Sequence, residues 1–170
     1  MKRAAAIVAG VLVVVAAVVV RFGSRGRRPV VSTLAVAEFQ SAEARILELV
    51  NSARKQAGVP PLILSDRLLS AARMHSQDMA AHRYLAHESA DGIPTADRVR
   101  AAGLDYEEVA ENLFSDPRPD IEALPTRAMT AWLASPEPRV NLLAARVRTA
   151  AVAIARAVDG SFYVTLDLMR

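Results

Sequence analysis

The sequence predicts an α/β (α+β) domain in which an antiparallel sheet is covered by helices. Residues 41–133 contain several stretches with the hydrophobic periodicity of amphipathic helices. Two segments rich in β-forming residues, 150–158 and 161–169, then close the chain. Helices first and paired strands later are typical of this fold class. The length of 170 residues suits one domain with a hydrophobic core.

The N-terminus carries a hydrophobic segment that could enter a membrane. Ala4–Val20 has no polar side chain and is flanked by Lys2, Arg3 and Arg21. As a helix it would be about 25 Å long, close to the short limit for crossing a hydrocarbon core of roughly 30 Å. The nearest small-residue cleavage pattern, at residues 35–37, lies beyond a basic stretch. We therefore favour an uncleaved anchor over a secretory signal peptide.

These features predict three parts in the chain. Residues 1–21 form a transmembrane anchor or signal segment, 22–37 a basic flexible linker, and 38–170 the folded domain. Two basic residues precede the hydrophobic segment and four follow it, so the positive-inside rule places the domain in the cytoplasm. A signal-anchor orientation places it outside. The charge pattern leaves both orientations open.

Charge separates the two ends of the chain. Six of the 21 basic residues and none of the 18 acidic ones lie in residues 1–30, so the rest carries 15 basic against 18 acidic side chains, a formal charge of −3. The basic end suits anionic lipid head groups, and residues 4–20 are expected to contact membrane lipid. The folded part has no basic excess, which argues against nucleic acid. Cysteine is absent, which excludes disulfides and thiolate chemistry.

Four stretches have helical periodicity, and their residue ranges are 41–56, 65–81, 95–102 and 120–133. Ser41 and Ser65 are the expected N-caps of the first two helices. His75 falls on the hydrophobic stripe of the second helix and is expected to be a core residue. Arg98, in the third helix, is expected to form an exposed ion pair of the kind that contributes about 0–1 kcal/mol.

The end of the chain changes to the period of a strand. Residues 106–114 are expected to be extended or irregular. Asp159-Gly160 is the two-residue signal of a tight hairpin between 150–158 and 161–169. In the last strand, hydrophobic residues alternate with three more polar ones, Tyr163, Thr165 and Asp167. One face of that strand is therefore predicted to be hydrophobic.

Several segments together resemble bacterial members of the CAP superfamily, also called SCP domains (cysteine-rich secretory, antigen five and pathogenesis-related proteins). The resemblance covers almost all of residues 42–169. It rests on the segments ILELVNSARKQAGVPPLILSDRLLSAA, HSQDMAAHRYLAHESADGIPTADRVRAAGL, VAENL and AWLASPEPRVNLL, followed by the final hairpin. VAENL is similar to the family's GEN motif with Ala110 for the glycine. The resemblance implies a three-layer α-β-α sandwich of the CAP type.

The resemblance also implies a cleft. Many family members carry two histidines and two glutamates that bind a divalent metal such as zinc. His87 takes the first histidine position and Glu111 the glutamate of the GEN motif. Pro138 stands where the second histidine would be, and Ser135 where eukaryotic members have the second glutamate. The implied tetrad is therefore degenerate.

The remaining donors decide what we expect of this cleft. Zinc sites need three or four protein ligands, and His87 and Glu111 supply two. Glu137 and His82 are the candidates for a third ligand. We therefore expect a binding cleft made by His87, Glu111, His82 and Glu137, with neither a bound metal nor catalysis. In this interpretation a His87–Glu111 hydrogen bond pins the loop to the strand and shields the imidazole from bulk water.

Three classes of function follow. We favour a membrane-tethered, extracytoplasmic CAP module that acts by binding, with a lipid, a sterol or a cell-wall fragment as the cleft ligand. The first alternative is a metal-dependent hydrolase of the family, which requires zinc at His87 and Glu111. The second is a structural envelope protein that makes only protein–protein contacts. The favoured location is the cell membrane with the domain outside, and the alternative is secretion after signal cleavage.

Overall fold

The computed structural model describes residues 33–170 of the chain, which contain nine helices and strands. In chain order they are α1 (Thr33–Gln56), β1 (Ile63–Leu64), α2 (Asp66–His82), α3 (Thr95–Ala101), β2 (Val109–Asp116), α4 (Leu124–Ala134), α5 (Pro136–Leu143), β3 (Thr149–Arg156) and β4 (Phe162–Met169). The predicted anchor, residues 4–20, lies outside the described residues. Among the described helices, none has both the length and the hydrophobicity that crossing a membrane requires.

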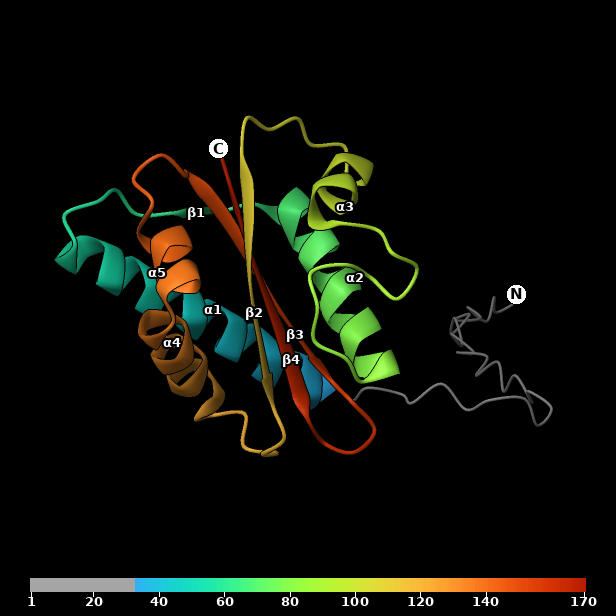
Figure 1. The fold of residues 1–170 in the computed structure, drawn as a ribbon. Coiled ribbons are helices and arrows are strands. Elements are labelled where there is room, and N and C mark those ends of the chain that lie inside the picture. Colours follow the sequence, from blue (N-terminus) through green and yellow to red (C-terminus); the bar gives the residue numbers. More distant parts are fainter. Residues whose placement is uncertain (1–32) are drawn as a thin grey trace, which may run out of the picture. The chain divides into compact units, whose positions relative to one another are not determined.

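The four strands form one sheet between two layers of helices (Figure 1). The strand order is β1-β3-β4-β2, with β1 parallel to β3 and the other neighbours antiparallel. Helices α1, α4 and α5 pack on one face, and α2 and α3 pack on the other. This three-layer α-β-α arrangement confirms the predicted fold class. It leaves β2 as an edge strand that is flanked by both layers.

The two faces of the central hairpin are packed differently. Residues of β3 that face α1 are large, such as Val152 and Ile154, whereas Ala151 and Ala153 face α2. Small side chains let α2 lie close to the sheet, and Ser76 of α2 donates a hydrogen bond directly to the backbone oxygen of Ala153 at 3.0 Å. The α2–α3 layer is therefore tightly fitted onto β3 and β4.

Both faces of β4 are buried, whereas the alternation in the sequence predicts only that one face is hydrophobic. Tyr163, Thr165 and Asp167 are 8%, 0% and 1% exposed. Alternation along one strand reports only that neighbouring side chains point to opposite faces. A second layer of helices covers the face that carries these residues, and this layer comes from distant parts of the chain.

A local signal places the start of α2 but not that of α1. Ser65 caps α2 as predicted, since its side chain accepts a hydrogen bond from the backbone N–H of Leu68. Helix α1, however, begins at Thr33 and not at Ser41. The segment between these residues contains no glycine or proline that would stop a helix. Ser41 is consequently an exposed position inside the helix.

An aspartate turn and a proline account for the remaining helical differences. Helix α4 begins at Leu124 and not at residue 120, because the Asp120 carboxylate accepts hydrogen bonds from the N–H groups of Glu122 and Ala123 and holds a turn there. Helix α5 has no counterpart among the predicted helices. It begins at Pro136, and proline is favoured at the first helical position because its φ is already helical and no N–H is lost.

The terminal hairpin forms where predicted, with a longer loop. Ala157 N–H donates to Ser161 O, so three residues connect the strands and not two. Gly160 has a φ of +94°, and Asp159 accepts a hydrogen bond from the N–H of Ser161. A three-residue hairpin needs a left-handed residue at its end, and the glycine supplies it.

Candidate functional site

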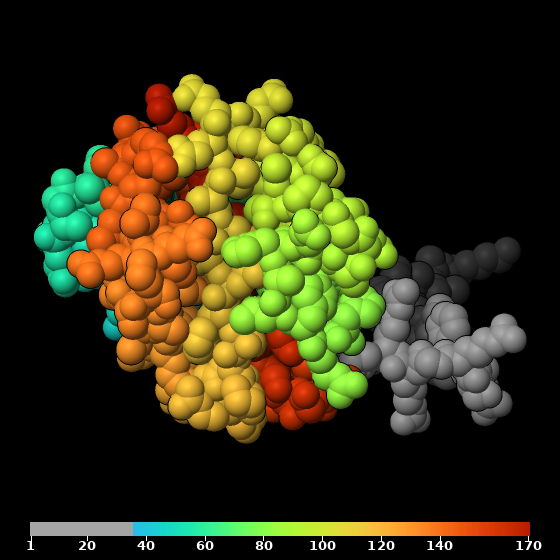
Figure 2. All heavy atoms as spheres, viewed as in Figure 1, coloured from blue at the N-terminus to red at the C-terminus, as the bar shows by residue number. Residues whose placement is uncertain are grey.

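A groove of about 550 Å³ runs along β2 between the two helical layers. Residues 108–113 form its floor. One wall contains residues 85–87 and Thr95, and the other contains Glu137, Pro138 and Asn141 of α5. Figure 2 shows the surface hollowed between the orange α5 region and the green segment after α2, with β2 between them. The groove therefore lies at the edge of the sheet.

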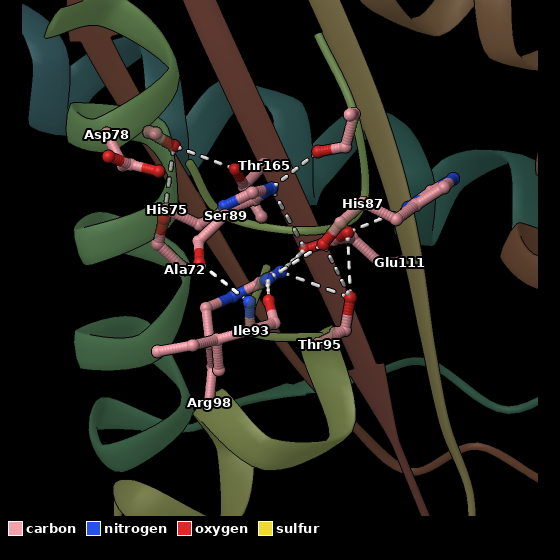
Figure 3. A network of polar contacts seen from close by, with 12 residues as sticks. Ala72, His75, Asp78, His87, Ser89, Ile93, Thr95, Arg98, Glu111 and Thr165 are labelled. Atoms are coloured by element: carbon pink, nitrogen blue, oxygen red, sulfur yellow. Dashed lines mark hydrogen bonds and ion pairs between the residues drawn. The ribbon is translucent and has the colours of Figure 1, made fainter. Parts of the chain in front are cut away.

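Glu111 of β2 is the centre of a buried polar network (Figure 3). Its side chain is 2% exposed. One carboxylate oxygen, Oε1, lies 2.8 Å from His87 Nδ1 and 2.9 Å from Thr95 Oγ1, and the other, Oε2, lies 2.5 Å from Arg98 Nη2. The structure thus brings His87 and Glu111 together, as the resemblance implies.

These three partners also set the charge of Glu111. Burial by itself raises the pKa of this carboxyl group, but the hydrogen bond from His87, the charge of Arg98 and the Thr95 hydroxyl outweigh it. The pKa of Glu111 is therefore below its ordinary value, and the group is a carboxylate. A carboxylate only accepts hydrogen bonds, so His87 Nδ1 is the donor.

Arg98 holds the loop before α3 onto β2. Besides Glu111, its guanidinium donates to the backbone oxygens of His87 at 2.7 Å and Ile93 at 2.9 Å. The residue is 6% exposed. The expectation of an exposed ion pair for Arg98 is therefore wrong. The loop folds back over α3, and its carbonyl oxygens supply acceptors that the sequence pattern does not reveal.

Asp167 is a site residue that sequence reasoning missed. It lies directly across the ladder from Glu111, in the register of β2 and β4, and it is 1% exposed. Burial, and then the negative charge of Glu111, raise the pKa of Asp167 well above its ordinary value. Burial and the neighbouring Glu111 charge therefore disfavour the ionised form of the Asp167 carboxyl group. Only the strand register reveals this pair.

His87 is exposed at the wall of the groove. Its side chain is 66% exposed, so the expectation that its imidazole is shielded from bulk water is wrong. The hydrogen bond to Glu111 raises the pKa of His87 against the opposing effect of burial, and the charges of Glu111 and Glu137 add to the increase. Because Nδ1 donates to Glu111, Nε2 accepts a hydrogen bond in the neutral form and donates one in the charged form.

The other two histidines have different surroundings. His75 is buried, as predicted, and its Nε2 pairs with Ala86 O at 2.9 Å. Burial lowers the pKa of His75, so this ring is a neutral core residue. His82 lies at the end of α2 and pairs with Asp78 at 2.8 Å. It does not line the groove, so its predicted place among the cleft residues is wrong.

Helix α5 supplies the opposite wall through its first turn. Glu137 lies in this turn and lines the groove. Pro138, at the position of the family's second histidine, offers only its backbone oxygen, which accepts a hydrogen bond from Asn112 Nδ2 at 2.9 Å. Asn141 donates in turn to Asn112 Oδ1 at 3.0 Å. The two asparagines therefore attach α5 to β2.

The donor set is small for a metal ion. Among residues 33–170, no group of three or more histidine, aspartate and glutamate side chains is arranged to hold one. Both oxygens of Glu111 already accept hydrogen bonds, and the Arg98 guanidinium lies 2.5 Å from one of them. Glu108 also lines the groove but is paired with Arg146. The donors that remain are His87 Nε2 and the Glu137 carboxylate, fewer than the three or four ligands of zinc sites.

Comparisons with known proteins identify one matching family model and one curated relative. The model of the cysteine-rich secretory protein family, CAP, matches residues 47–168. The uncharacterized protein YkwD of Bacillus subtilis (strain 168) is 29% identical over 112 residues, which are 66% of this chain and 42% of that protein. The chain thus spans less than half the length of this curated relative.

Two solved structures share the fold. An extracellular protein containing a SCP domain from Bacillus anthracis str. Ames has a TM-score of 0.67 at 21% identity, covering 77% of this chain and 41% of that chain. An outer surface protein from Borrelia burgdorferi has a TM-score of 0.68 at 15% identity, covering 77% of this chain and 93% of that chain. At these identities the likeness concerns the fold alone.

Proposed function

This chain belongs to the cysteine-rich secretory protein (CAP) family, and on that premise we propose that it is an extracytoplasmic binding module tethered to the membrane by residues 4–20. The groove along β2 is the proposed binding site, with His87, Glu111 and Glu137 as its polar residues. Its role is to hold a ligand without converting it.

The hydrogen bonding and ion pairing of the Glu111 carboxylate are the observation that carries this proposal. Its carboxylate accepts hydrogen bonds from His87 and Thr95 and is paired with a buried guanidinium. Such a carboxylate is a poor general base, because its pKa is lowered and both of its oxygens already accept hydrogen bonds. The groove also lacks a serine or cysteine among its lining residues to act as a nucleophile.

The proposal includes a groove without zinc. A dication at Glu111 would lie beside the Arg98 guanidinium, and it would have to displace that cation from a side chain that is almost fully buried. The alternative function, a metal-dependent hydrolase, needs such a displacement. The donor geometry therefore favours binding over metal chemistry.

The proposed location outside the cytoplasm draws on the relatives. One structural neighbour is described as an extracellular protein and another as an outer surface protein. The basic residues after the hydrophobic segment favour the opposite orientation. A reporter that is active only after export, fused behind Arg170, should be active in cells. Activity of a cytoplasmic reporter at the same position would contradict the proposed location.

Metal analysis separates the binding module from the hydrolase. The whole chain, purified and dialysed against zinc, should retain much less than one zinc per chain, with no difference between wild type and His87→Ala. His82→Ala is the matched control, because His82 is an exposed histidine outside the groove. Stoichiometric zinc that is lost in His87→Ala and kept in His82→Ala would favour the hydrolase.

Retention assays separate binding from a purely structural role. The immobilised chain is offered lipid vesicles, sterols and cell-wall fragments. Leu85→Asp places a charge in the groove wall at a position that is 49% exposed, and Val158→Asp makes the same kind of change in the hairpin loop, at 94% exposure. We expect Leu85→Asp to reduce retention of the ligand and Val158→Asp to preserve it. Failure to retain any of these ligands would favour the structural envelope protein.

A further inference from the structure

The floor of the groove is the outer edge of a strand. β2 pairs only with β4 among the described strands, and it stands last in the sheet order. In an antiparallel ladder, successive residues direct their N–H and C=O groups alternately toward the partner strand and away from it. Every second residue of β2 therefore directs its backbone polar groups into the groove.

Two hydrogen bonds identify which residues these are. Arg170 N–H donates to Glu108 O from the β4 side. Trp132 Nε1 donates to Leu113 O at 2.8 Å from the α4 side. The even-numbered residues thus face β4, and Val109, Glu111 and Leu113 face outward. No hydrogen bond within residues 33–170 engages the outward backbone groups of Val109 and Glu111.

The walls restrict what can pair with this edge. Exposed strand edges commonly pair with other sheets unless something blocks them. Here α5 stands on one side of the outer edge of β2, and the loop with His87 stands on the other side. Both project past this edge. A second folded sheet would collide with these walls. A single extended segment, which lies about 4.8 Å from its neighbouring strand, needs only the width of the groove.

The charges of the groove favour a basic ligand. Glu108 is paired with Arg146, and Glu111 is paired with Arg98. Glu137 lines the groove and forms no ion pair with any described residue. The α5 wall of the groove therefore carries a negative charge, on Glu137, that has no ion-pair partner among the described residues.

We propose that the groove binds an extended peptide segment that adds to β2 as a fifth strand and presents basic side chains to Glu137. This inference rests on the proposed function, since it names the ligand class of the same groove. Main-chain hydrogen bonds to Val109 and Glu111 supply the affinity, and the two walls of the groove contact alternate side chains of the peptide and supply the specificity. Side chains on the α5 side meet Glu137 and Asn141, and those on the other side meet His87 and Thr95. The preferred peptide alternates basic and uncharged residues.

Backbone methylation of the peptide tests the proposal on the whole chain. The probe is a fluorescein-labelled heptapeptide in which lysine alternates with threonine. Two further versions carry N-methyl groups, one at every lysine amide and one at every threonine amide. Fluorescence polarisation should show binding of the parent, about tenfold weaker binding of one methylated version, and a smaller change for the other, because only alternate amides face β2. Equal binding of all three peptides would overturn the proposal.

Substitutions and hydrogen exchange in the protein provide a second test. Glu137→Gln should weaken binding of the lysine peptide about two- to fivefold, the size of an exposed ion pair. Glu122→Gln, at an exposed residue outside the groove, should leave it unchanged. Bound peptide should also slow hydrogen exchange at the Val109 and Glu111 amides. No slowing at these amides, or an equal effect of both substitutions, would overturn strand addition.

The outcomes keep this inference apart from the proposed function. If the lysine peptides do not bind while lipid or cell-wall fragments are retained in a Leu85-dependent manner, strand addition is overturned and the binding module stands. If the peptide binds with the alternating methylation pattern and is then cleaved, strand addition is supported and the non-catalytic role is overturned.

Discussion

Replacing Arg98 by methionine should be among the most destabilising changes on the α2–α3 face. The substitution removes the guanidinium that pairs with Glu111 and that holds the backbone oxygens of His87 and Ile93. Methionine fills similar space but leaves a buried carboxylate without its counter-charge. Removing one partner of a buried ion pair costs about 3–5 kcal/mol, a large part of the roughly 5–15 kcal/mol by which a typical domain is stable.

Urea unfolding of the whole chain measures this cost. Arg100→Met is the matched control, because Arg100 lies on the same helix and forms an exposed pair with Asp97, and it should cost less than about 1 kcal/mol. The double variant Arg98→Met/Glu111→Met removes both buried charges and should recover much of the loss.

The pH dependence of the stability difference between wild type and Arg98→Met gives an independent check of the role of Arg98. The pKa of Glu111 is lowered in the folded protein, so its stabilising contribution is present above the ordinary value of 4.5 and is lost as pH falls through the lower, folded value. Without Arg98, burial raises the pKa of Glu111, and the carboxyl group then becomes neutral more easily. The difference between wild type and Arg98→Met should therefore shrink between about pH 7 and about pH 4. A loss below about 1 kcal/mol at neutral pH, or a loss that does not change with pH, would refute the assigned role of Arg98.

Two further predictions concern the neighbouring titratable groups. The raised pKa of Asp167 means that its stabilising contribution is present below its ordinary value of 3.8 and is lost as pH rises through the folded value, so Asp167→Asn should gain stability relative to wild type between about pH 4 and about pH 8 in urea unfolding. A gain that stays constant with pH would contradict the raised pKa of Asp167. The raised pKa of His87 means that its contribution is full below its ordinary value of 6.5 and is lost as pH rises through the folded value. NMR titration should find the pKa of His87 above 6.5 in wild type, lower in Glu111→Gln and unchanged in Glu122→Gln; an unchanged pKa in Glu111→Gln would exclude the hydrogen bond as its cause.

Features that depend on neighbouring residues were predictable. Ser65 caps α2, and Asp159-Gly160 lies in the loop of the hairpin. Each of these signals acts within a few residues, through a side chain that bonds to nearby backbone or a glycine that adopts a left-handed conformation. The helical stripe of α2 likewise places His75 in the core.

The candidate site was predictable only in part. The family resemblance brought His87 and Glu111 together, and both line the groove with Glu137. His82 was misplaced, because a position close to His87 in the sequence does not reveal that α2 ends there and directs the chain away. Whether the groove binds a ligand stays a prediction.

The sequence by itself determined the hydrophobic segment, the succession of helices followed by a terminal hairpin, and the family to which the chain belongs. The tertiary structure alone decided that Arg98 and Asp167 are buried beside Glu111 and that β2 has an open outer edge. The physical reason is that burial and charge state depend on which layers meet, and these layers come from segments far apart in the chain. A pattern of period two or 3.6 reports which residues share a face, but not what covers that face.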